Sequence, residues 1–102
     1  MKKEVKKYAG IFNDARGGMT DSGRIIRQAW VFGLIPETET CEGWLVAGIE
    51  DLWRKINVEW EKYGFLVSNL PDDLRERFDR IEGEAVKRAR DAGWDPELDD
   101  ND

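Results

Sequence analysis

Residues 43–64 carry the pattern that most limits how this chain can fold. Apolar side chains recur there every three or four residues, which is typical of an amphipathic helix with one face in a core. At about 100° per residue they fall within an arc of roughly 120°. They are Leu45, Val46, Ile49, Leu52, Trp53, Ile56, Trp60 and Tyr63. We therefore predict a central helix in which Trp53 and Trp60 are core residues, while Trp44 lies nearly opposite the stripe.

Two helical segments are predicted before this stripe. The first covers about Lys3 to Asn13, where apolar residues recur at helical spacing. The second covers about Ser22 to Gly33, after a capping candidate at Thr20 or Asp21. One broad side of this second helix is apolar and is expected to face the core. Its opposite, polar side carries Arg24, Arg27 and Gln28.

A last helix is predicted after residue 70. Pro71 suits the first helical turn, and the two acidic residues that follow favour the positive end of the helix dipole. Its narrow apolar stripe contains small residues, so another helix is expected to approach closely before Gly93 ends it. For the tryptophan helix, Thr40 is the predicted cap and Gly64 the left-handed terminator. The stripe of the last helix consists of Leu74, Phe78, Ile81, Ala85, Ala89 and Ala92.

The predicted fold is all-α, a small helical bundle of about four helices. The last helix is expected to pack antiparallel to the tryptophan helix through the short connection GFLVSNLP. An alternative adds a minor short strand pair between residues 30–35 and 65–70, which would make the class α+β. Residues 1–93 are expected to form a single helical domain, and residues 94–102 an acidic C-terminal tail.

Charge is distributed unevenly along the chain. The formal net charge is −6, yet residues 1–19 hold five basic and two acidic residues, and the last nine hold five acidic and no basic ones. An acidic total disfavours nonspecific binding to nucleic acid, which depends on basic surface. The single cysteine and the lack of a long apolar run favour a cytoplasmic protein with no membrane partner.

The residue types for common catalytic chemistry are scarce. There is no histidine, which excludes a histidine-dependent triad and the commonest zinc ligand. Cys41 stands near a predicted helix start, but acidic neighbours oppose a lowered pKa, so a small buried thiol is expected rather than a nucleophile. We expect no enzymatic activity, and we identify no cofactor site, metal site or small-molecule substrate.

The stretch GMTDSGRI has glycine spacing that invites comparison with a phosphate-binding loop. Gly18 and Gly23 are separated by four residues and precede a predicted helix. Arg24 and Ile25, however, stand where that motif requires lysine and then serine or threonine. We interpret the stretch as a flexible connection that caps a helix.

These observations favour a small non-catalytic interaction protein, either an adaptor or an acidic inhibitor of a protein partner. Tryptophans outside the main stripe are candidates for a partner or homodimer surface, because tryptophan is enriched at binding hot spots. An acidic cluster ahead of the tryptophan helix would serve an inhibitor that occupies a basic surface. The predicted partner-binding residues are Trp44, Trp94, Glu37, Glu39 and Glu42.

The alternative function is a dimeric DNA-binding transcriptional regulator that uses the basic N-terminal region. It requires the basic side chains to converge on one surface, because phosphate contacts dominate DNA affinity. The residues concerned are Lys2, Lys3, Lys6, Lys7, Arg24 and Arg27.

Overall fold

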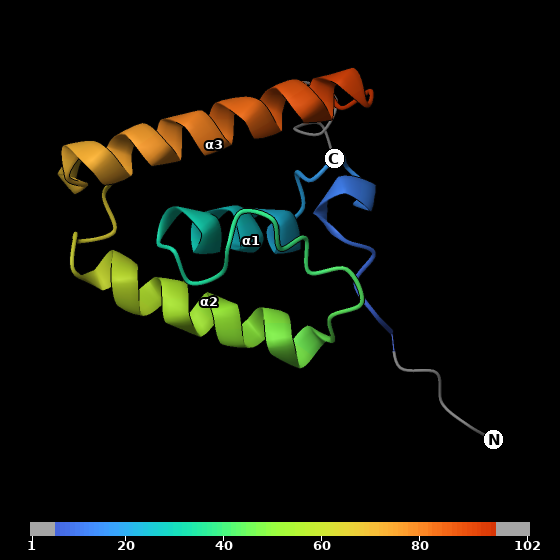
Figure 1. Ribbon diagram of the computed structural model, residues 1–102, viewed down its shortest axis with the longest axis horizontal. Helices are drawn as coiled ribbons and strands as arrows, with labels where there is room; N and C mark the ends of the chain where they lie inside the picture. The colour runs from blue at the N-terminus through green and yellow to red at the C-terminus, as the bar shows by residue number, and fades with distance from the viewer. Residues whose placement is uncertain (1–5, 96–102) are drawn as a thin grey trace.

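The computed structural model describes residues 6–95, and these residues are mostly helical (Figure 1). Within that range there are three α-helices and no β-strand, so the all-α class is confirmed while the strand pair between residues 30–35 and 65–70 is not found. None of these helices is both long and apolar enough to cross a membrane. The helices are α1 (Asp21–Val31), α2 (Val46–Glu61) and α3 (Asp72–Asp91), with short 3-10 turns η1 (Ile11–Asn13) and η2 (Val67–Asn69).

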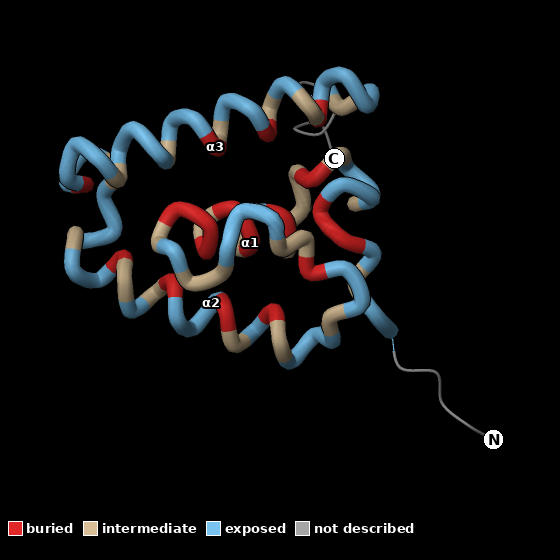
Figure 2. Tube along the Cα trace, viewed as in Figure 1, coloured by how far each residue is buried: buried red, intermediate tan, exposed pale blue. Residues whose placement is uncertain are grey.

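Helix α1, rather than the tryptophan helix, occupies the centre of the fold. Figure 1 shows α1 between α2 and α3, and Figure 2 shows buried residues concentrated along it. Helices α2 and α3 run antiparallel on opposite sides of α1 and approach each other near their connection. There the rings of Trp60 and Phe78 lie 6.2 Å apart. The prediction that the tryptophan helix is central is therefore wrong, whereas α3 does run antiparallel to it, although both helices pack mainly against α1.

The composition of α1 explains its central position. Its apolar side packs into the core, while on its polar side Arg27 pairs with Glu82 of α3 and Gln28 accepts from Trp60 of α2, so the helix is covered on more than one side. Ile26, Ala29 and Val31 are fully buried, and Trp30 donates from Nε1 to the carbonyl oxygen of Glu39 at 3.0 Å. The run AWVFGLI thus ends a helix and does not form a strand. The guanidinium of Arg77 on α3 donates to the carbonyl oxygen of Val31 at 3.1 Å, which satisfies a free helix end.

Residues 6–10 are not helical and form one isolated antiparallel bridge, between Lys7 and Leu45, so the helix predicted at Lys3–Asn13 is not formed in its described part. Tyr8 donates its N–H to the Trp44 carbonyl and its own carbonyl accepts from the Gly43 N–H, both at 2.8 Å. The segment thus lies beside the loop that precedes α2. Gly10, with φ of 95°, has left the helical region, and this local pairing replaces helical hydrogen bonds.

Helix α2 starts later than the sequence suggests. Thr40 does not cap it; its hydroxyl accepts instead from the Glu42 N–H at 3.4 Å. Cys41 and Gly43 have φ values of 61° and 81°, which prevents a helix from running through the loop. The predicted terminator Gly64 does adopt a left-handed φ of 64°. Only one narrow side of α2 is buried, consisting of Ile49, Leu52, Ile56 and Trp60.

Helix α3 begins one residue after Pro71, as its start signal predicts, and Gly93 follows its end with φ of 97°. The small residues of its stripe do permit close approach, but by a loop and not by a helix. A Cβ on Gly17 would lie 2.9 Å from the Ala89 Cα atom. Ala92, which was assigned to the stripe, is exposed.

Candidate binding groove

A groove lies between the N-terminal part of α1 and the first half of α2, with a volume of about 660 Å³. Its apolar lining comes from Ile25 on α1, Trp44 in the preceding loop, and Val46, Ile49 and Trp53 on α2. Two of these side chains are largely open to solvent, with Trp53 50% and Val46 60% exposed. Contiguous exposed apolar surface is a feature of interaction sites, whereas single exposed apolar residues are ordinary. We call this surface the α1/α2 groove.

A smaller hollow of about 290 Å³ continues the groove along α2. Both hollows are lined by Arg24, Ile25 and Trp53, so they meet at these side chains. The smaller one extends to Phe65, which is also largely exposed. Together they follow α2 from Val46 to beyond Trp60, roughly 21 Å at the usual helical rise. That length suits a short segment of another chain better than a compact metabolite.

Trp44 forms one wall of the groove and packs on the first turn of α2. A Cβ built on Gly48 would lie 3.1 Å from the Trp44 Cε3 atom, so the absence of a side chain at position 48 makes room for the ring. The indole is partly buried. Part of this predicted partner-binding residue therefore belongs to the scaffold, and part faces the groove.

Asp14 holds the N-terminal side of the groove together. One carboxylate oxygen accepts from the Tyr8 hydroxyl at 2.6 Å and from the Thr20 hydroxyl at 2.5 Å, and the other accepts from the Arg16 N–H at 3.1 Å. Burial, followed by the hydrogen bond to Asp14, raises the pKa of Tyr8 well above its ordinary value. Tyr8 is therefore a neutral donor at physiological pH. This cluster shapes the wall of the groove.

The charged side chains around the groove are of both signs. Lys6, Lys7 and Arg24 line it together with Asp21 and Glu50. Arg24 lies 3.9 Å from Asp21 in a solvent-exposed pair, a contact that contributes little. Among residues 6–95, neither Lys6 nor Lys7 lies in an ion pair. Two free ammonium groups therefore stand at one end of an apolar groove.

Two of the three residues in the predicted acidic cluster, Glu37 and Glu39, have hydrogen-bond partners within the molecule. Glu37 receives two hydrogen bonds from Arg80 on α3, both 2.9 Å, and these hydrogen bonds lower the pKa of Glu37. Glu39 accepts from the Cys41 N–H at 3.0 Å, and the side chain of Glu42 lies close to Gly10. Glu37 and Glu39 therefore hold loops in place, and none of the three residues lines the groove.

Trp94 does not join Trp44. Trp94 is partly buried and follows the end of α3, where its backbone N–H donates to the Ala89 carbonyl oxygen at 2.9 Å. It is absent from the lining of the groove. The five predicted partner-binding residues thus contribute only Trp44 to this surface.

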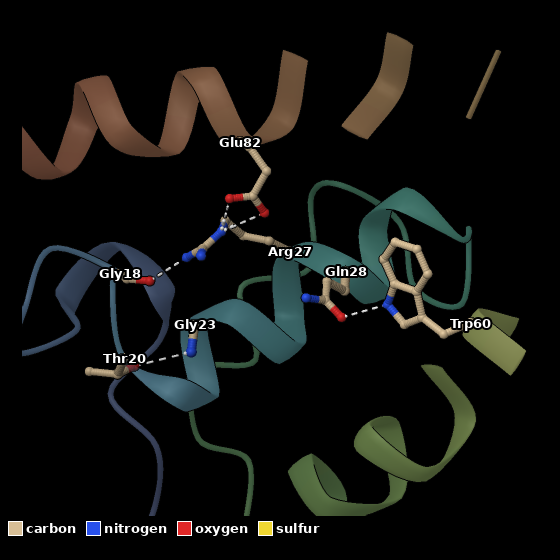
Figure 3. A network of polar contacts seen from close by, with 7 residues as sticks. All are labelled: Gly18, Thr20, Gly23, Arg27, Gln28, Trp60 and Glu82. Atoms are coloured by element: carbon tan, nitrogen blue, oxygen red, sulfur yellow. Dashed lines mark hydrogen bonds and ion pairs between the residues drawn. The ribbon is translucent and has the colours of Figure 1, made fainter. Parts of the chain in front are cut away.

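Arg27 and Gln28, expected on a solvated side of α1, both face neighbouring helices (Figure 3). Arg27 Nε donates to both carboxylate oxygens of Glu82 on α3, at 3.1 and 3.2 Å, and its guanidinium also donates to the Gly18 carbonyl. Gln28 Oε1 accepts from Trp60 Nε1 on α2 at 2.8 Å. Because Arg27 is only 5% exposed, it is withdrawn from any DNA-contacting surface.

The glycine spacing in GMTDSGRI has a packing explanation. A Cβ on Gly23 would lie only 2.1 Å from the Gly18 carbonyl oxygen, so Gly23 is required where the loop crosses the first turn of α1. The Thr20 hydroxyl accepts from the Gly23 N–H at 3.1 Å, which confirms Thr20 as the helix cap (Figure 3). The stretch therefore caps the N-terminus of α1.

Cys41 is fully buried, as expected of a structural thiol. Burial, and to a smaller degree the negative charge of Glu39, raises the pKa of the Cys41 thiol to about 12. A thiol in this environment is protonated at neutral pH and is a poor nucleophile.

We expect Cys41 to react with a disulfide reagent at pH 8 only after urea unfolds the chain, measured as thiolate release. In the unfolded chain the thiol ionises near pH 8.5 or so. The native state holds this proton more tightly than the unfolded chain does. The resulting stabilisation is present below the pH at which the unfolded thiol ionises, and it is lost as the pH rises toward about 12. Cys41→Ala should flatten this loss between pH 8 and pH 9.5, before Tyr8 contributes. Rapid reaction of the native protein would contradict the burial.

The main error in the sequence interpretation concerns Trp53, which was assigned to the core and is half exposed. A signal was present in its helical neighbours. Glu50 and Asn57, three residues before and four residues after Trp53, lie on the same line of the helix surface. Polar residues on both sides indicate the edge of the stripe and not its centre. The sequence interpretation also assigned Lys6 and Lys7 only to DNA binding and did not predict their position at the groove.

The described residues form a small helical domain with an open, partly aromatic groove. No protein-family model matches the chain, and neither a curated protein nor a solved structure is similar to it. The proposal that follows therefore depends on the geometry alone.

Proposed function

We propose that this chain is a non-catalytic interaction protein, an adaptor that binds a segment of a partner protein in the α1/α2 groove. The observation that carries the proposal is the exposure of Trp53 and Val46 in a groove that also contains Trp44. Tryptophan at the centre of an interface commonly contributes 2 kcal/mol or more to binding, about a 30-fold change in affinity.

The groove favours the adaptor over the acidic inhibitor. Glu37 is held by Arg80, so its carboxylate would have to leave an intramolecular pair before it could meet a basic partner. The groove instead offers apolar surface that a partner can bury. Apolar burial is not screened by salt, whereas pairing of exposed charges weakens as ionic strength increases.

The test is recovery of partners from an extract of the encoding organism, with the tagged protein compared with two single variants. Trp53→Ala should lose a partner that the unchanged protein retains, because the ring is the largest exposed apolar group in the groove. Val58→Ala is the matched control. Val58 lies on the same helix and is 57% exposed, but it lines neither hollow. The partner should remain bound at high salt.

Equal recovery with Trp53→Ala and the unchanged protein would remove the groove as the binding surface. Loss of binding with both variants would point to a different face of α2. Loss of the partner at moderate salt would favour the acidic-inhibitor alternative.

A further inference from the structure

The last nine residues of this protein are strongly acidic and contain no basic residue. Five of the acidic residues that give the chain a net charge of −6 lie in the final nine positions. Residues 96–102, which fall outside the described part, read PELDDND and contain a single large apolar residue, Leu98. We call residues 96–102 the acidic segment. Its composition complements the free Lys6 and Lys7 and the apolar lining beside them.

The described part of the chain ends close to the border of the groove. The end of α3 packs against the loop after η1: Ala89 contacts Gly17, and the guanidinium of Arg88 lies 4.5 Å from the centre of the Phe12 ring. Asp14 and Ala15 of the same loop line the groove. Figure 1 shows this loop between the end of α3 and the N-terminal segment. Seven residues reach roughly 23 Å when extended, enough to pass around one loop.

We propose that the acidic segment docks on the Lys6/Lys7 end of the α1/α2 groove of its own chain, with its carboxylates near the two lysines and Leu98 against the apolar lining. This inference rests on the proposed function, because it makes the segment a built-in competitor for the partner site. Displacement by a partner, or by salt, then opens the groove.

The expected docking is weak enough to be reversible. Pairs between exposed lysines and carboxylates are individually weak, and salt screens them. Covalent attachment compensates, because a short tether holds a segment at an effective concentration in the millimolar range. A segment held in this way lowers the apparent affinity for a partner without blocking it.

A nitroxide spin label on residue 101 of the full-length protein tests the docking. Asn101→Cys introduces a second thiol for labelling, while the buried Cys41 is not expected to react under native conditions. The readout is paramagnetic broadening of the tryptophan indole N–H signals. We expect the Trp44 signal to lose more than half of its intensity, compared with the reduced label. It should recover at about 0.5 M salt, where the screening length falls to about 4 Å.

Two charge-reversed variants separate local docking from a general charge effect. Lys6→Glu with Lys7→Glu should abolish the broadening. Lys55→Glu with Lys62→Glu changes the net charge equally at positions outside both hollows and should preserve it. Equal loss in both variants, or no broadening at low salt, would overturn the proposal. So would broadening found only when labelled chains are mixed with separate isotope-labelled chains, because the segment would then occupy another copy.

The test of segment docking can fail independently of the test of the proposed function. Docking of the segment is measured in the free protein, whereas the adaptor proposal is measured by partner recovery with Trp53→Ala. A partner that depends on Trp53, combined with a segment that never approaches Trp44, would refute the inference and leave the adaptor proposal intact.

Discussion

Replacing Arg27 with methionine will lower the free energy of unfolding by about 3 kcal/mol or more, within the range of about 3 to 5 kcal/mol for breaking a buried ion pair. The methionine would fill much of the same space but would leave the Glu82 carboxylate and the buried Gly18 carbonyl without their donor. Glu82 retains some access to water, which places the expected loss near the lower end. Chemical denaturation followed by circular dichroism measures it.

Two further variants serve as a control and a rescue for this prediction. Arg24→Met, on the exposed side of the same helix, should change stability by less than about 0.5 kcal/mol. The double variant Arg27→Met with Glu82→Leu should recover most of the loss, because it removes both charges. If Arg27→Met unfolds like the unchanged protein, the polar link between α1 and α3 does not stabilise this fold.

Replacing Trp60 with alanine will also cost about 3 to 5 kcal/mol, the usual range for a large aromatic in a core. Trp60 is only 7% exposed and lies where α2 meets both other helices. Its ring makes edge contacts with Phe32 at 5.1 Å and Phe78 at 6.2 Å. Because small domains have only about 5 to 15 kcal/mol of stability, much of the population could unfold.

The conservative change Trp60→Phe separates packing from hydrogen bonding in the same experiment. Phenylalanine retains an aromatic ring between the neighbouring rings but loses the 2.8 Å hydrogen bond to Gln28. The loss of that hydrogen bond should cost about 1 kcal/mol, with a further contribution from the smaller ring. If Trp60→Ala were as stable as Trp60→Phe, the three-helix junction would not be the aromatic core inferred here.

Local signals predicted several boundaries correctly. Thr20 caps α1, Pro71 precedes α3, and Gly64 and Gly93 adopt left-handed conformations beyond their helices. Each of these depends on the chemistry of a few neighbouring residues, so each can be deduced from a short window. The predicted helix at Lys3–Asn13 failed in its described part because residues from a distant loop supply its hydrogen bonds.

The arrangement of the helices could not be predicted in the same way. Helical spacing shows that a residue lies on an apolar stripe, but not how many neighbours cover that stripe. Helix α2 has the broader stripe, yet it packs mainly against α1, so Trp53 remains open at the edge. Arg27 is polar in sequence and buried in the fold because α3 supplies Glu82.

The groove is assembled from three segments that are distant in sequence. Lys6 and Lys7 come from the extended N-terminal part, Ile25 from α1, and Trp53 from α2. No local pattern brings these side chains together. Trp44 was identified because it does not fit the stripe, whereas the acidic residues near it in sequence are held elsewhere by Arg80 and by the loop backbone.

The central claim is that α2 has an inner side that supports the fold and an outer side, around Trp53, that is free to bind. The unfolding free energy of Trp53→Ala, measured beside that of Trp60→Ala, tests it most directly. We predict a loss of about 1 to 1.5 kcal/mol for Trp53→Ala, less than half of that for Trp60→Ala, because half of the Trp53 side chain is already exposed. Equal losses at the two positions would show that Trp53 belongs to the core and would contradict the claim.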